Sequence, residues 1–140
     1  MQDRGSRPAW RVEIEELHAF FEAWMGGTIP RTEEQLDRLE EALEKRFTFV
    51  TTSGQVLARE AIVGAVRESH GARPGLRIRL REPRLVHSCK HHVVATYQEW
   101  QEAEGERTGR TSTVVLERKE EAPNGLVWIH VHETWITQTS

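Results

Sequence analysis

Two histidines separated by one residue mark the last strongly patterned stretch of the chain. In VWIHVHETWI, residues 127 to 136, His130 and His132 share a face if the stretch is a β-strand. Two such imidazoles could share a metal ion, but a complete site needs a third and a fourth ligand, of which His91 or His92 could supply one. The other interpretation is a hydrogen-bonded pair at a protein interface. We adopt it, because no carboxylate of the stretch shares their face, and we expect neither a metal nor a cofactor.

Glu133 is the carboxylate of the same stretch, and it falls on the opposite face. Strict alternation divides the stretch into Val127, Ile129, Val131, Glu133 and Trp135 on one face and Trp128, His130, His132 and Thr134 on the other. The more apolar set should meet the covering helices, which puts Glu133 and Trp135 at the mouth or floor of a cavity. A carboxyl among apolar neighbours has a raised pKa and can act as a general acid or base. The alternative is a salt bridge of Glu133 near the rim.

The first half of the chain predicts three helices and one short strand. Apolar residues recur at helical spacing from Trp10 to Trp24, and two glycines then end the helix. Thr32 can cap a second helix, whose apolar stripe is Leu36, Leu39 and Leu43. Residues 47 to 54, FTFVTTSG, read as a short strand, and a third helix is expected over about residues 58 to 70.

The second half predicts four long strands joined by hairpin loops. Alternation in LRIRLR, residues 76 to 81, sends Arg77 and Arg79 to the outer face of a sheet. Three more strands follow at residues 91 to 101, 110 to 119 and 126 to 136, and Pro83 predicts a bend in the first long strand. The expected fold is therefore α+β, a cone-shaped, curved mixed or antiparallel sheet covered on one face by three N-terminal helices.

Length and composition indicate one domain over residues 10 to 137, preceded by a flexible arm at residues 1 to 9. The formal net charge of −3 lacks the basic excess that nucleic acids or anionic lipids attract, so we expect neither as a partner. The only cysteine is Cys89, which excludes a disulfide within the chain. Together with the lack of a signal or membrane-spanning stretch, this favours a cytoplasmic protein.

The element order, together with the ending WIHVHET, resembles the nuclear transport factor 2-like superfamily. More narrowly, residues 10 to 136 resemble the SnoaL-like group and the association domain of calcium/calmodulin-dependent protein kinase. The resemblance implies a cone-shaped subunit and dimerisation through the outer sheet face. It does not imply one activity, because the superfamily includes isomerases, cyclases, hydrolases, dehydratases and scaffolds.

The resemblance also implies positions for pocket residues. Matching VVATYQEW to the association domain places Gln98 and Trp100 on an inward face, and Thr113 takes a similar position in the next strand. The association domain has arginines where this chain has Gln98 and Thr113, which argues against an anionic ligand. Ketosteroid isomerase-like members carry an aspartate base where this chain has Thr51 and Thr52, and a hydroxyl cannot replace that base at neutral pH.

Two hypotheses about function follow from these residues. The first is a homodimer whose cavity binds a small, mostly apolar molecule. The cavity residues would be His18, Gln98, Trp100, Thr113, Glu133 and Trp135, and the interface residues Arg77, Arg79, Trp128, His130 and His132. If it is an enzyme, Glu133 would move a proton in an isomerisation, cyclisation or dehydration, while His18 or Gln98 orients or polarises a carbonyl. For the tryptophans the alternative is core packing, and for His18 a capping or surface role.

The second hypothesis is a non-catalytic association or ligand-sensing module. Its motivation is the expected outer face, which is rich in residue types favoured at interfaces. A cavity filled by side chains would favour the module, and an open cavity with a buried carboxylate would favour the enzyme.

Overall fold

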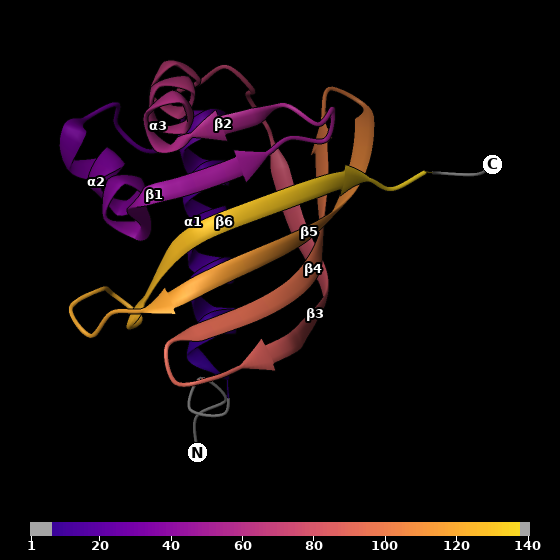
Figure 1. Cartoon of the computed structure of the whole chain (residues 1–140). Coiled ribbons are helices and arrows are strands. Elements are labelled where there is room, and N and C mark those ends of the chain that lie inside the picture. Colours follow the sequence, from indigo (N-terminus) through magenta and orange to yellow (C-terminus); the bar gives the residue numbers. More distant parts are fainter. Residues whose placement is uncertain (1–6, 138–140) are drawn as a thin grey trace.

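A computed structural model of the 140-residue chain describes residues 7–137. The elements, in chain order, are α1 (Ala9–Gly26), α2 (Glu33–Ala42), β1 (Leu43–Val50), β2 (Val56–Ala58), α3 (Arg59–Glu68), β3 (Arg77–Ser88), β4 (His92–Ala103), β5 (Glu106–Arg118) and β6 (Leu126–Trp135) (Figure 1). All predicted helices and strands are present, and β2 is additional. Leu43, which was expected in the stripe of the second helix, instead opens β1. The predicted flexible arm lies mostly outside the described residues.

The six strands form one mixed sheet in the order β2-β1-β6-β5-β4-β3. β1 runs parallel to β6, and all other neighbours are antiparallel. The sheet curves around α1, which crosses its concave side, while α2 and α3 lie beside β1 and β2 at one end (Figure 1). The predicted α+β cone fold is confirmed.

The apolar stripe of α1 explains why the helix lies inside the curve of the sheet. Ile14, Leu17 and Trp24 are almost fully buried, and they meet the apolar residues of the concave sheet face. Gly27 ends the helix with a φ of 76°, a left-handed conformation that glycine adopts without steric cost.

Backbone irregularities bend two of the long strands, β3 and β6. In β3, Glu82 has a φ of 52°, and the register with β4 shifts between Arg81 and Arg84, which confirms the bend expected at Pro83. In β6, His130 pairs with Val115 and Trp128 pairs with Leu116, so Ile129 is an extra residue in the strand.

The bulge at Ile129 reverses the predicted orientation of Trp128. The prediction assumed unbroken alternation along β6, but one extra residue moves every side chain before it to the other face. Trp128 is therefore 2% exposed and packs in the core, so its assignment to the outer interface is wrong. His130 and His132 do lie on the outer face, where His130 Nδ1 is 2.8 Å from the hydroxyl of Thr48 on β1.

Candidate functional site

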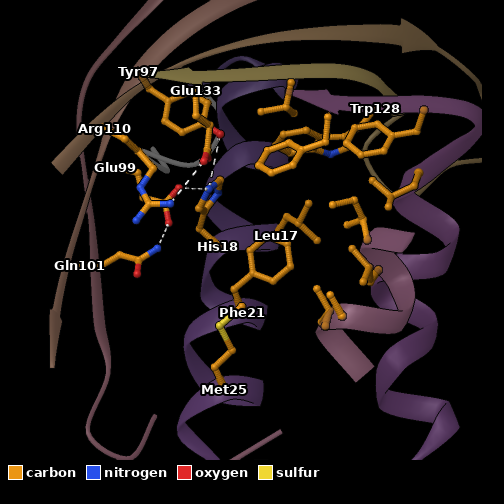
Figure 2. Close-up of a pocket in the computed structure, with 18 residues that line it drawn as sticks. Leu17, His18, Phe21, Met25, Tyr97, Glu99, Gln101, Arg110, Trp128 and Glu133 are labelled. Atoms are coloured by element: carbon orange, nitrogen blue, oxygen red, sulfur yellow. Dashed lines mark hydrogen bonds and ion pairs between the residues drawn. The ribbon is translucent and has the colours of Figure 1, made fainter. Parts of the chain in front are cut away.

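A cavity of about 200 Å³ lies between the helices and the concave face of the sheet. Its walls are mainly apolar, with Leu17, Phe21 and Met25 contributed by α1 and further apolar side chains by α3, β1 and β6 (Figure 2). Polar side chains gather on one side of the cavity: His18 from α1, Tyr97, Glu99 and Gln101 from β4, Arg110 from β5 and Glu133 from β6. An apolar enclosure with a few convergent polar groups is typical of a small-molecule site.

His18 and Glu99 form a buried pair at this polar side. His18 Nε2 lies 3.1 Å from Glu99 Oε1, and His18 Nδ1 lies 2.8 Å from the backbone oxygen of Ile14. The second carboxylate oxygen of Glu99 accepts a hydrogen bond of 2.7 Å from the side-chain amide of Gln101. Both ring nitrogens thus face oxygen acceptors, so both carry a proton when Glu99 is ionised.

The charges of this pair support one another. Burial disfavours the charged imidazole, but the charge and hydrogen bond of Glu99 outweigh it and raise the pKa of His18. Burial likewise disfavours the carboxylate, but the charge and hydrogen bond of His18 lower the pKa of Glu99 to about 2. Each group therefore stabilises the charged form of the other in the folded protein.

Glu133 is the less firmly held carboxylate of the cavity. Its side chain is 9% exposed, and its contacts are long, 3.3 Å from Arg110 Nη1 and 3.5 Å from the hydroxyl of Ser112. Burial and the nearby charge of Glu99 raise the pKa of Glu133, and the guanidinium of Arg110 only partly opposes them. Such a carboxyl can exchange a proton with a bound molecule more readily than Glu99 can.

Arg110 and Tyr97 complete the polar side. Arg110 Nε is buried and has no hydrogen-bond partner among the described residues, while the guanidinium lies 4.9 Å from the ring centre of Trp135. The Tyr97 hydroxyl lies 3.4 Å from His18 Nε2. Burial and the two carboxylates raise the pKa of Tyr97 well above its usual value, so the hydroxyl keeps its proton.

Of the residues predicted for the cavity, some line it, one lies outside it and three lie on the outer face of the sheet. His18 and Glu133 line the cavity. Trp135 does not line it, because its ring is half exposed and lies against Arg110. Glu133 is buried on the cavity wall and ion-paired with Arg110, so the salt bridge considered for it is present within the cavity.

Gln98, Trp100 and Thr113 lie on the outer face, so their assignment to the cavity is wrong. On β4 the residues facing the helices are Val93, Ala95 and Tyr97, one position out of step with the motif match. Trp100 packs instead on the outer face, over Gly109 and under the guanidinium of Arg107, which lies 4.2 Å from its ring centre. The argument against an anionic ligand rested on these positions and falls with them, since the cavity does contain Arg110.

Sequence reasoning missed four residues of the site, namely Tyr97, Glu99, Gln101 and Arg110. The alternation of inward and outward side chains within each strand could have revealed them. Val93 and Ala95 are the more apolar set of β4, and continuing that set leads to Tyr97, Glu99 and Gln101. On β5, Val114 and Leu116 lead back to Ser112 and Arg110 in the same way.

The outer face contains three rows of cross-strand neighbours without Asp, Glu, Lys or Arg. The rows are Val94–Val115–His130, Thr96–Thr113–His132 and Gln98–Thr111–Thr134 across β4, β5 and β6. We call these nine residues the outer patch. Arg77 and Arg79, also predicted for the interface, are exposed on the edge strand β3 beside it.

Comparison with known proteins gives the family of the chain. The family described as Sucrose-6-phosphate phosphohydrolase C-terminal matches residues 11–137. The chain belongs to this family. Sucrose-phosphatase 1 of Nicotiana tabacum is 31% identical over 129 residues, which cover 89% of this chain and 30% of the relative. Probable sucrose-phosphatase 2 of Arabidopsis thaliana is 26% identical over a similar span. The chain thus spans about 30% of the length of the sucrose-phosphatases it matches.

Solved structures agree on the fold of this family member. An NTF-2 like protein of unknown function from Pseudomonas aeruginosa is 34% identical, with a TM-score of 0.85 over 92% of this chain and 99% of that one. The CaMKII hub of S. rosetta has a TM-score of 0.72 at 12% identity, over 91% and 95% of the two chains. A putative ketosteroid isomerase from Shewanella frigidimarina has a TM-score of 0.67 at 15% identity, over 93% and 98%. The nuclear transport factor 2-like fold is confirmed, and the last two likenesses concern the fold alone.

Residues 7–137 contain neither a helix suited to span a membrane nor a cluster of metal-binding side chains. None of the helices there is long and apolar enough to cross a membrane. In the same part of the chain, no cluster of three or more histidine, cysteine, aspartate or glutamate side chains is arranged to hold a metal ion.

Proposed function

We propose that the cavity binds a small, mostly apolar, neutral molecule that carries a carbonyl group, and that Glu133 exchanges a proton with it. The observation that carries this proposal is the position of Glu133, a buried carboxyl with long contacts and a raised pKa on the wall of an apolar cavity. Carboxyl groups with pKa values raised by burial are frequent at catalytic sites.

The charge balance of the polar side favours a neutral ligand. When Glu133 is ionised, its charge and that of Glu99 are matched by those of His18 and Arg110. A charged ligand would add an unmatched charge inside a mainly apolar enclosure, which costs free energy. The donors of the cavity wall suit an oxygen acceptor, because Arg110 and Tyr97 line the cavity and the Tyr97 hydroxyl keeps its proton.

The corresponding chemistry is proton transfer next to a carbonyl. Glu133 takes a proton from the carbon beside the carbonyl, and the electron pair of that C–H bond moves onto the carbonyl oxygen. The hydroxyl of Tyr97 and the guanidinium of Arg110 are the available groups to stabilise that oxygen. In a ligand with a C=C bond next to that carbon, return of the proton to the far carbon of the double bond would re-form the carbonyl, shift the double bond and so isomerise the molecule. In this scheme Glu99 stabilises the charged form of His18, and Gln98, on the outer face, has no part.

Hydrogen exchange of a simple ketone tests this proposal without knowledge of the natural substrate. 1-Indanone has a compact apolar body, and exchange of its protons beside the carbonyl in D₂O is followed by NMR. The wild-type protein should accelerate the exchange above buffer, and Glu133→Gln should remove about 100-fold or more of that acceleration. Thr113→Val, on the outer patch, is the matched control and should keep it. Equal rates in the wild type and Glu133→Gln would remove Glu133 from the chemistry.

The outer patch favours a second function, self-association. The nine side chains, in three adjacent rows, include no Asp, Glu, Lys or Arg, so this surface could pack against a second copy without burying such a charge. The CaMKII hub shares the fold at 12% identity, and hub domains are assemblies. A homodimer through this face is compatible with the ligand proposal, because the cavity opens on the concave side.

The sugar phosphate in the name of the relatives is not part of the proposal. A phosphorylated sugar is dianionic and covered with hydroxyl groups, whereas most of the cavity wall is made of aliphatic and aromatic side chains. The cavity therefore suits a different chemical class from the substrate after which the relatives are named.

A further inference from the structure

Glu13 on α1 is a fully buried carboxylate that the proposed chemistry does not use. Its exposure is 0%, and it accepts three hydrogen bonds. Oε1 accepts from Arg38 Nη2 of α2 at 2.9 Å and from the Asn124 amide of the β5–β6 loop at 2.8 Å. Oε2 accepts from the indole nitrogen of Trp128 at 2.8 Å. A carboxylate away from water needs such partners, and here they come from three different elements.

Trp128 connects this carboxylate to the cavity. Its indole N–H is the only polar group of the side chain, and it is directed to Glu13. Its ring lines the cavity, with its centre 6.3 Å from the centre of the His18 ring. Figure 2 shows Trp128 across the cavity from Arg110 and Glu99. The ring therefore limits the space beyond the polar side.

We infer that Glu13 is a positioning residue, which fixes the ring of Trp128 as one wall of the cavity and so limits the size of the ligand. This inference rests on the proposed ligand-binding function. A tryptophan ring turns about two side-chain torsions, and the bond to Glu13 selects one orientation. Arg38 and Asn124 hold the carboxylate in turn, so two side chains at the surface of the molecule support the shape of the buried cavity.

The chain offers a matched control one turn away on α1. Glu16 also accepts a hydrogen bond from Asn124, at 2.9 Å, and lies 3.6 Å from Arg38, but it has no contact with Trp128 in the described structure. Glu16→Gln thus weakens the same supports and leaves the bond to the indole intact. Trp128→Phe makes the complementary change, because it removes the N–H and keeps an aromatic ring.

The test compares the affinities of two ketones, 1-indanone and the longer 2-acetylnaphthalene, by calorimetry. Glu13→Gln should change their affinity ratio by about fivefold or more in favour of the longer ketone, an effect comparable to losing one hydrogen bond. Trp128→Phe should change the ratio in the same direction, and Glu16→Gln should leave it unchanged. An altered melting temperature with an unchanged ratio in Glu13→Gln would overturn the inference, because Glu13 would then be only structural.

A second readout keeps the inference separate from the proposed function. The indole N–H resonance of Trp128 is assigned by its loss in Trp128→Phe, and it should move in Glu13→Gln and stay in place in Glu16→Gln. If neither ketone binds the wild type, the proposed function fails, and this resonance decides the inference alone. An unmoved resonance in Glu13→Gln overturns it. If Glu13→Gln does not fold, the affinity ratio in Trp128→Phe decides, and an unchanged ratio overturns the inference.

Discussion

The imidazole of His18 and the carboxylate of Glu99 form an ion pair inside the protein, although 81 positions separate them in sequence. Their side chains are each 6% exposed, and Nε2 lies 3.1 Å from Oε1. The pair joins α1 to β4 at the polar side of the cavity. Its burial means that either partner alone would be an uncompensated charge.

Removal of one partner of this pair should therefore lower the free energy of unfolding more than removal of both partners. We expect His18→Gln or Glu99→Gln to lower the free energy of unfolding by about 3–5 kcal/mol. The double variant His18→Leu/Glu99→Met, which replaces the pair with apolar side chains, should lose less than either single change. Urea unfolding at pH 7 measures all three. A double variant that loses the sum of the two single effects would contradict a coupled pair.

Acid should remove the contribution of Glu99 in a defined pH range. The pKa of this carboxyl is lowered to about 2 in the folded protein, so its stabilisation is complete above the unfolded value of about 4.3 and is lost as the pH falls toward about 2. The double variant lacks this loss. Parallel stability curves of the wild type and the double variant between these two pH values would contradict the assignment.

Glu133 should show the opposite dependence on pH. Its pKa is raised by burial and by Glu99, so the folded protein retains a proton that the unfolded chain has already released. Stability from the protonated form is present below the unfolded pKa and is lost as the pH rises through the folded one. The stability of Glu133→Gln relative to the wild type should therefore increase as the pH rises above about 4.3. Thermal unfolding across this range measures the difference, and a constant difference would argue against a raised pKa.

The outer patch predicts which substitutions break a dimer. Thr113 lies in the central row between Thr96 and His132, so Thr113→Glu would place a charge in the middle of the interface. We expect a dimer in the wild type, by light scattering after size exclusion, and a monomer with unchanged circular dichroism in Thr113→Glu. Thr28→Glu, in the loop after α1, is the control and should remain dimeric. A folded wild-type monomer at micromolar concentration would refute this interface.

Gly109 and Trp100 predict a steric effect on the same face. A Cβ added at Gly109 would lie 2.5 Å from an atom of the Trp100 ring, so Gly109→Ala forces the ring to move. The expected loss is about 1–3 kcal/mol of unfolding free energy. In the Trp100→Leu variant, Gly109→Ala should lower the free energy of unfolding much less, since the ring is absent. Equal losses in both backgrounds would exclude the clash as the cause.

The sequence was most informative where one periodicity persists through an element. The stripe of α1 and the bend at Pro83 follow directly from residue types, and they were predicted correctly. Glu133 was expected on the cavity side for the same reason, because the strand alternates regularly after the bulge at Ile129.

The errors arose where local patterns do not reveal backbone irregularity, or where a motif match selected the wrong face of a strand. One extra residue at Ile129 moved the side chain of Trp128 to the opposite face of the sheet. A bulge of this kind cannot be recognised from the alternation of residue types before it. Arg110 was overlooked as a pocket residue because the match at Thr113 selected the wrong face of its strand, whereas the set of Val114 and Leu116 leads back to Arg110. The pairing of His18 with Glu99 could not be predicted, since it depends on how α1 crosses β4.

The most direct test of the central claim is to map the binding of 1-indanone by methyl NMR. The cavity proposal predicts saturable shifts of methyl groups on its wall, such as those of Leu17, Ile62 and Val131. The methyl groups of Val94 and Val115, on the outer patch, should not move. An absence of shifts, or shifts confined to the outer patch, would contradict a ligand site inside the cone.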